Sequence, residues 1–349
     1  MSAKAVIFGC SGHQLSADEI AFFQQLQPWG FILFARNMAS EQQVIELTDS
    51  LKATVKHQPH IFIDEEGGRV SRLRSIGGWI GPPAAHFLAS GAPLELCIKA
   101  IRTNYRAIGT RLAKLGITAD CAPVLDLPVD GSDPIIGDRA FSQQAAQIAT
   151  LAQACLDGLT DAGIAGVIKH IPGHGRAEVD SHLSLPLVTT KLTELAKTDF
   201  VPFKSLNSAK MAMTAHIVYS SIDPDNPATT SKIIIDEIIR NQIGFDGLLM
   251  SDDLDMKALR GSLANRGQQA LLAGCDMLLH CSGDLSAMWE LATIIPELTA
   301  KAKERADLAK PALTTTPMSR IQEVGQAQDQ FNKLFIGKTD NERATKQSN

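Results

Sequence analysis

The sequence contains no apolar run long enough to cross a membrane, and this absence is the first guide to its class. It also has no block of lysines and arginines suited to a phosphate backbone, since a net charge of -5 is spread over 349 residues. We therefore expect neither a membrane nor a nucleic acid as a partner. The N-terminus, MSAKAVIFGCSGHQL, has too few apolar residues for a signal peptide, which predicts a cytoplasmic protein.

Closely spaced pairs of cysteines are missing as well. The six cysteines are scattered along the chain at positions 10, 97, 121, 155, 275 and 281. In a chain of this size, such spacing favours buried free thiols over a disulfide framework and agrees with a reducing compartment. The apolar fraction of 44% is ordinary for a globular protein and sufficient for a sizeable core.

Eight short runs rich in Val, Ile, Leu, Met and Phe recur along the chain. They span residues 5–9, 30–35, 60–64, 117–124, 166–170, 211–217, 247–251 and 276–281. Such near-continuous apolar runs fit parallel strands that are buried on both faces.

Patterns typical of helices lie between these runs. Residues 16–19 and 40–43 resemble capping boxes, in which a serine opens a helix and a Glu or Gln three residues later closes the cap. Apolar residues at helical spacing predict further helices over 94–115, 143–162, 192–208, 233–242 and 263–273. Glycines 116, 163, 244 and 274 fall where a helix should end before a strand.

Eight strands that alternate with helices predict a single-domain (β/α)8 TIM-like barrel, with an open doubly wound sheet as the alternative. The barrel predicts that chemistry gathers at the carboxyl ends of the strands, and polar residues follow five of the runs there: Asp64, Asp126, Lys169, His170, His216 and Asp252. We expect the barrel to occupy residues 1–336 and the polar, aperiodic residues 337–349 to form a disordered tail.

Two of these strand ends carry carboxylates suited to catalysis or binding. Asp252 could serve as nucleophile, general base or metal ligand, although an aspartate here could also cap a helix. Asp64 precedes Arg72 in DEEGGRVSR, and a carboxylate beside an arginine can hold vicinal hydroxyls, because one accepts and the other donates. Glu65 and Glu66 could either take part in the site or form solvated or buried ion pairs, and the sequence favours neither alternative.

Further candidates come from basic residues. Lys169 and His170 follow a buried run, where an unpaired charge is costly, so a polar ligand is favoured there. Arg139 and His216 are either ligand donors or members of a salt network. Asp180 lies two residues before His182, and a turn that paired them would fix the imidazole tautomer.

A zinc hydrolase is the main alternative chemistry. His170, His174, Asp180 and His182, with His216 and Asp252 elsewhere, are residue types that bind zinc. However, a proline and a glycine between the first two histidines remove the helical spacing that would place them on one face. The first strand also supplies no histidine pair, so we expect no metal.

Taken together, the motifs resemble those of the family 3 glycoside hydrolases, and more closely the single-domain bacterial β-N-acetylglucosaminidases of cell-wall recycling. The motifs are GFILFARN, IDEEGGRVSRL, CAPVLDL with IGDRAF, KHIPGHG with a downstream DSH, and MSDDLDM. The resemblance implies a retaining mechanism in which Asp252 is the nucleophile and His182, oriented by Asp180, is the acid/base. It also implies that the terminal sugar is bound by Asp64, Arg72, Arg139, Lys169 and His170, with His216 as a weaker candidate.

The same resemblance implies an exo-acting monomeric enzyme without a cofactor. Its substrate would be N-acetylglucosamine β-linked to 1,6-anhydro-N-acetylmuramic acid, with or without a stem peptide. Another sugar specificity and a catalytically silent sugar-binding barrel are the remaining alternatives. The chain departs from the family at Glu65, where Gln is frequent, and at Ile171, where Phe is usual.

Overall fold

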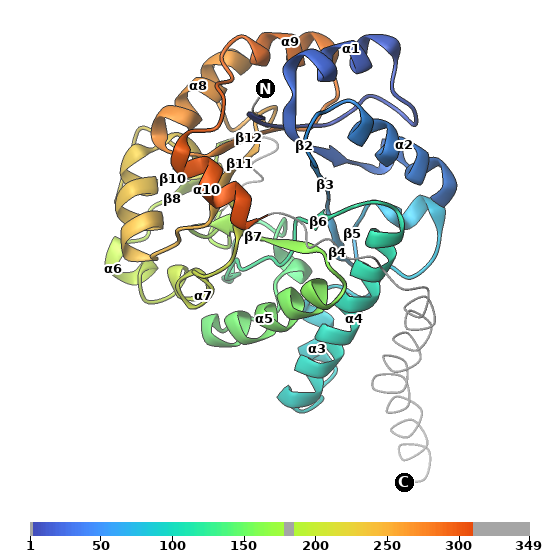
Figure 1. Cartoon of the computed structure of the whole chain (residues 1–349). Helices are drawn as coiled ribbons and strands as arrows, with labels where there is room; N and C mark the ends of the chain where they lie inside the picture. The colour runs from blue at the N-terminus through green and yellow to red at the C-terminus, as the bar shows by residue number, and fades with distance from the viewer. Residues whose placement is uncertain (1–2, 178–184, 310–349) are drawn as a thin grey trace, which may run out of the picture.

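The computed structural model describes residues 3–177 and 185–309, and their strands close into a parallel barrel (Figure 1). Around the barrel the strand order is β1-β12-β11-β9-β7-β6-β3-β2. The strands are β1 (Lys4–Phe8), β2 (Pro28–Leu33), β3 (His60–Ile63), β6 (Ala119–Asp120), β7 (Ala165–Ile171), β9 (Met211–Thr214), β11 (Leu248–Asp253) and β12 (Met277–His280). All eight coincide with the predicted apolar runs, so the barrel is confirmed and the open sheet is excluded.

Helices surround the strands, as Figure 1 shows. The longer ones are α1 (Ala17–Leu26), α2 (Glu41–Ala53), α4 (Leu94–Lys114), α5 (Ala145–Asp161), the π-helix η5 (Ile234–Gln242), α8 (Leu263–Ala273), α9 (Leu285–Ala292) and α10 (Ala300–Leu308). The predicted capping box of α1 is present, because the Ser16 hydroxyl accepts from Glu19 N and the Glu19 carboxylate accepts from Ser16 N. The box of α2 is incomplete, since Gln43 accepts from Ala39 N instead of Ser40 N.

One predicted helix is wrong in extent. Residues 192–208 form two short helices, α6 (Leu192–Leu195) and α7 (Phe200–Ser205). Pro202 explains the break, because a proline has no N–H for the carbonyl four residues earlier and its ring collides with that carbonyl. The carbonyl belongs to Thr198 and accepts from Val201 N at 3.2 Å instead. The side chains of Thr198 and Asp199 accept from Arg176.

The apolar core has two layers. One fills the barrel with strand side chains such as Ile7, Phe62, Val167 and Met250, and the other lies between the strands and the helices. All six cysteines are buried and free, which confirms the prediction from their spacing. Within the described ranges, no helix is both long and apolar enough to span a membrane.

Two long loops stand at the carboxyl ends of the strands. Residues 67–93 include the end of a hairpin, β4 (Glu65–Gly67) with β5 (Val70–Ser71), then η2 (Leu73–Ile76) and α3 (Ala85–Ala89); residues 127–141 include η3 (Gly137–Arg139). Arg69 joins the two loops, because its Nε lies 2.8 Å from Asp138 Oδ1 and its Nη2 donates to the carbonyl of Pro134. In the chain, β8 (Leu187–Val188) follows β7 and β10 (Val218–Tyr219) follows β9. These two strands form a short parallel pair outside the barrel.

Candidate functional site

A polar cavity of about 330 Å³ opens at the carboxyl ends of the barrel strands. It is lined by five of the predicted sugar-binding residues and by the predicted nucleophile, namely Asp64, Arg72, Arg139, Lys169, His170 and Asp252. The two long loops supply Val70, Ile135 and Ile136 to its wall. Another cavity, of about 280 Å³, lies at the amino ends of β7 and β9, and among the described residues that line it Lys210 has the one charged side chain. The predicted nucleophile and the predicted sugar-binding residues named above line the first cavity.

Asp64 is held between two cations at the end of β3. Its Oδ1 lies 2.9 Å from Lys169 Nζ, and its Oδ2 lies 2.9 Å from Arg72 Nη2. Burial alone would raise the pKa of Asp64, but the two positive charges hold it well below its usual range. The same contacts raise the pKa of the buried Lys169 ammonium above its ordinary value. All three groups are therefore charged at neutral pH.

Glu66 extends this network and was not singled out from the sequence. Its two oxygens lie 2.8 Å from Nε and Nη2 of Arg139, and Oε1 lies 2.7 Å from Lys169 Nζ. Although burial would raise its pKa, these cations lower it to about 2. Glu66 also lines the cavity.

The two-residue period of extended chain explains why neighbouring acids differ. Asp64 and Glu66 face the cavity, whereas Glu65 turns away and accepts from Arg72 N at 2.9 Å and Leu73 N at 3.1 Å. Burial raises the pKa of Glu65. This alternation is the sequence signal that could have identified Glu66 as a member of the site.

His170 is held by a carboxylate outside the cavity lining. Its Nδ1 lies 2.7 Å from Asp126 Oδ2, while Asp126 Oδ1 accepts from His170 N at 3.1 Å and His174 N at 2.7 Å. Asp126 is completely buried, yet its contacts with His170 and His174 lower its pKa against the effect of burial. His174 also lines the cavity, and burial lowers its pKa to about 4.

Asp252 lies near the end of β11, across the barrel from β3. Its Oδ1 accepts from Asp253 N at 2.8 Å. The Asp253 carboxylate accepts from Cys281 N at 3.1 Å and Asp255 N at 3.2 Å. Burial and the negative charges of Asp255 and Asp252 raise the pKa of Asp253 to about 6. This side of the cavity therefore carries an excess of negative charge.

His216 does not line the cavity, contrary to the sugar contact that the sequence suggested for it. It is completely buried, with Nδ1 2.7 Å from Thr229 Oγ1 and Nε2 2.9 Å from the carbonyl of Asp253. Burial lowers its pKa, so the ring is neutral at physiological pH. The structure corrects its place from the sugar pocket to a support beneath the end of β11.

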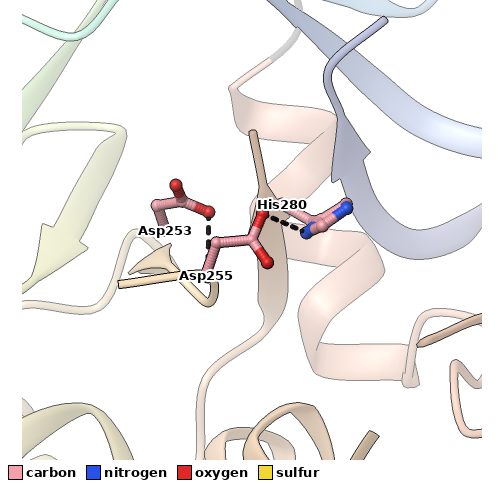
Figure 2. Close-up of side chains that lie close together, drawn as sticks. All are labelled: Asp253, Asp255 and His280. Carbon is pink, nitrogen blue, oxygen red and sulfur yellow. Dashed lines mark hydrogen bonds and ion pairs between the residues drawn. The ribbon is translucent and has the colours of Figure 1, made fainter. Parts of the chain in front are cut away.

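Figure 2 shows three possible metal ligands that lie close together, Asp253, Asp255 and His280. The His280 Nδ1 lies 3.0 Å from Asp255 Oδ2, so these two side chains already form an ion pair or hydrogen bond. None of the three belongs to the zinc set considered from the sequence. Over residues 3–177 and 185–309 that set does not assemble either, because Asp126 occupies His170 Nδ1 and His216 has both nitrogens in contact with protein atoms.

The predicted acid/base pair, Asp180 and His182, lies outside the described residues. Arg176, shortly before these residues, contacts Asp199 at the start of α7 at 2.7 Å and Glu194 on α6 at 3.0 Å. The role of the pair stays a prediction.

Comparisons with known proteins agree with the barrel and its cavity. Residues 9–311 match the model of the glycosyl hydrolase family 3 N-terminal domain. The chain is 36% identical over 299 residues to a beta-hexosaminidase of Nitrosomonas eutropha, which covers 84% of this chain and 85% of that protein. It is also similar to the crystal structure of NagZ from Neisseria gonorrhoeae, with a TM-score of 0.86, 31% identity and coverage of 96% and 98%. A further structure of that protein, with equal scores, contains N-trifluoroacetyl-D-glucosamine.

Proposed function

The chain belongs to glycosyl hydrolase family 3 and is a β-N-acetylglucosaminidase of that family, and we propose that it removes a terminal sugar with retention of anomeric configuration. The observation that carries this proposal is the placement of Asp252 in the same cavity as the paired charges of Asp64, Lys169 and Glu66. One region offers a carboxylate for attack, and the other offers fixed donors and acceptors for hydroxyl groups.

We propose that Asp64, Arg72, Arg139, Lys169 and His170 bind the N-acetylglucosamine. Each charged member of this set is fixed by a partner before the substrate arrives, so little ordering is needed on binding. The ammonium and the guanidinium groups donate to hydroxyl or acetamido oxygens, while Asp64 accepts from a hydroxyl. Glu66 keeps Lys169 and Arg139 in place.

In the proposed first step, Asp252 attacks the anomeric carbon and forms a glycosyl ester as the bond to the leaving oxygen breaks. The imidazolium of His182, oriented by Asp180, gives its proton to that oxygen. In the second step the neutral imidazole takes a proton from water, whose oxygen attacks the anomeric carbon and releases Asp252. Two inversions give net retention and return the histidine to its protonated form.

The environment of Asp252 supports its role as a nucleophile. It must be ionised to attack, and a second full negative charge on Asp253 would oppose this. Because the pKa of Asp253 is raised to about 6, that residue retains part of its proton just below neutrality. The donation from Asp253 N also orients the Asp252 carboxylate.

For the substrate, we propose N-acetylglucosamine β-linked to 1,6-anhydro-N-acetylmuramic acid, with or without a stem peptide. The similar protein that binds N-trifluoroacetyl-D-glucosamine supports the sugar, and the similarity to NagZ supports the aglycone. We also propose a cytoplasmic monomer without a cofactor, whose catalytic domain spans residues 1–336 and whose tail spans 337–349.

Proton NMR of a hydrolysis reaction tests this mechanism. An aryl N-acetyl-β-glucosaminide is expected to give the β-anomer first, with the α-anomer appearing only by mutarotation. The Asp252→Ala variant should be inactive but, with added azide, should form the α-glycosyl azide, because the small anion replaces the missing carboxylate in one displacement. First appearance of the α-anomer with the wild type, or full activity of the variant, would contradict the proposal.

A further inference from the structure

Asp126 is the buried carboxylate that makes the most contacts to the KHIPGHG segment, although it does not line the cavity. It follows β6 and accepts three hydrogen bonds, two from the backbone of His170 and His174 and one from the His170 ring. Its side chain is fully buried, so no water competes for these contacts. A carboxylate in this position controls both the path of the segment and the state of the imidazole.

The charge state of Asp126 determines which nitrogen of His170 carries a proton. The pKa of Asp126 lies below its ordinary value, so the group is ionised at neutral pH and can only accept. A contact of 2.7 Å between its Oδ2 and His170 Nδ1 therefore requires a proton on Nδ1. In a neutral imidazole, this leaves the other nitrogen as an acceptor.

The two nitrogens of the His170 ring therefore have different hydrogen-bonding roles. We propose that Asp126 is a positioning residue that holds His170 as the Nδ1–H tautomer, so that Nε2 is offered to the cavity as an acceptor for a sugar hydroxyl. This inference deepens the proposed function, because the identity of the ligand rests on that function. The tautomer of His170 does not depend on it.

The consequence concerns selectivity. Lys169, Arg72 and Arg139 can only donate, and each oxygen of Asp64 and Glu66 already accepts from one of these cations, which leaves each carboxylate fewer lone pairs for a ligand. The acceptor on His170 adds to that of Asp64 and favours a ligand group that can donate, such as a hydroxyl, over one that can only accept. A sugar with fluorine in place of that hydroxyl should be discriminated against.

The Asp126→Asn variant separates positioning from simple structural support. Its amide oxygen can keep accepting from His170 N and His174 N, which preserves the turn. Its NH2 group then meets His170 Nδ1 and must donate, which moves the ring proton to Nε2. The variant is thus expected to keep its fold but to reverse the hydrogen-bonding character of the ring in the cavity.

Asp120→Asn is the matched control. Asp120 is also fully buried, lies six positions earlier, and accepts from Glu65 N at 2.9 Å. Burial raises the pKa of Asp120 well above its usual range, which favours the uncharged form that an amide resembles. This variant should leave the His170 tautomer unchanged.

Nitrogen-15 NMR of the full chain labelled at histidine provides the test, with the His170 signals assigned by their loss in His170→Gln. Once the ring carries a single proton, the wild type and Asp120→Asn should hold it on Nδ1, and Asp126→Asn should hold it on Nε2. A singly protonated ring with its proton on Nε2 in the wild type overturns the proposal even if no variant folds.

Kinetics on an aryl N-acetyl-β-glucosaminide completes the test. Asp126→Asn should raise KM about tenfold and change kcat by less than about threefold, as expected for one reversed hydrogen bond. Among 3-, 4- and 6-deoxyfluoro substrates, the one most disfavoured by the wild type should lose most of that penalty in the variant. An unchanged penalty at every position overturns the role in binding. A protein without hydrolase activity, but with the expected spectra, would instead refute the proposed function.

Discussion

The two sides of the cavity treat their carboxylates in opposite ways. Beside β3 and β7, Asp64 and Glu66 share Lys169 and each has an arginine of its own, so their pKa values are lowered. Beside β11, Asp252 and Asp253 are adjacent, and the pKa of Asp253 is raised to about 6. The first side is therefore fixed in charge across the neutral range, whereas the second can change its charge within it. We expect binding to be insensitive to pH and the reactive side to respond to it.

The largest effect is expected from removing the nucleophile on the second side. Asp252→Ala should lower kcat for an aryl N-acetyl-β-glucosaminide by at least about a thousandfold, because the carboxylate that forms the ester is lost. Asp255→Asn, three residues further along, is the control and should stay within about threefold of wild type. Equal losses in both variants would show that local disruption, not lost chemistry, is being measured.

The next largest effect, on stability and on substrate binding, is expected from removing Lys169, the cation that Asp64 and Glu66 share. In Lys169→Met, two buried carboxylates lose a partner, which should cost about 3 kcal/mol of unfolding free energy as well as raising KM. Urea denaturation followed by circular dichroism measures the change. The double variant Lys169→Met with Glu66→Gln should recover part of the stability, and failure to recover any would argue against charge as the cause.

Acid titration distinguishes the two sides by the sign of their effect. The folded pKa of Asp253, about 6, lies above the value of about 3.9 expected in the unfolded chain, so its stabilising contribution is present at low pH and is lost as pH rises through 6. Relative to Asp253→Asn, the wild type should lose about 2 kcal/mol between pH 4 and pH 6.5 and little above that. Thermal unfolding at several pH values measures this difference, and a constant difference would contradict it.

Glu66 should show the opposite sign over a lower range. Its folded pKa, about 2, lies below the unfolded value of about 4.3, so its stabilising contribution is lost as pH falls from 4 towards 2. Wild type and Glu66→Gln should therefore converge in unfolding temperature on acidification. If the unfolding temperatures of the two proteins differed by the same amount at every pH, the predicted difference between the two sides would be contradicted.

The smallest effect is expected at Glu65, which faces away from both sides. Glu65→Gln keeps an oxygen to accept from Arg72 N and Leu73 N, and burial already disfavours the charged form. Activity should stay within about threefold and stability within about 1 kcal/mol. A large loss would mean that the departure from the family at this position was matched by changes elsewhere in this chain.

Much of the fold could be predicted because buried parallel strands leave a strong apolar signal. The two-residue extent of β6 could not, since the apolar run over 117–124 continues beyond its last paired residue to Pro123, which cannot donate to a neighbouring strand. The split of residues 192–208 follows from Pro202, whose effect depends on a backbone bond that an apolar pattern does not reveal.

The candidate site was predictable where a polar residue directly follows a strand, as with Asp64, Lys169 and Asp252. The same rule misplaced His216, because a histidine at a strand end can equally turn to buried protein atoms. The rule did find Asp126 but gave it no role, because its role depends on contacts with residues more than forty positions away. Such partners become visible only when the barrel closes.

The ion pair between Arg69 and Asp138 couples the movements of the two loops at the rim of the cavity. A ligand that displaces one loop must therefore also displace the other or separate this pair. The mouth thereby resists being widened from either loop alone. Barrel enzymes usually acquire new substrates through changes in loop length. Here such changes would have to occur in both loops together to preserve the ion pair between Arg69 and Asp138.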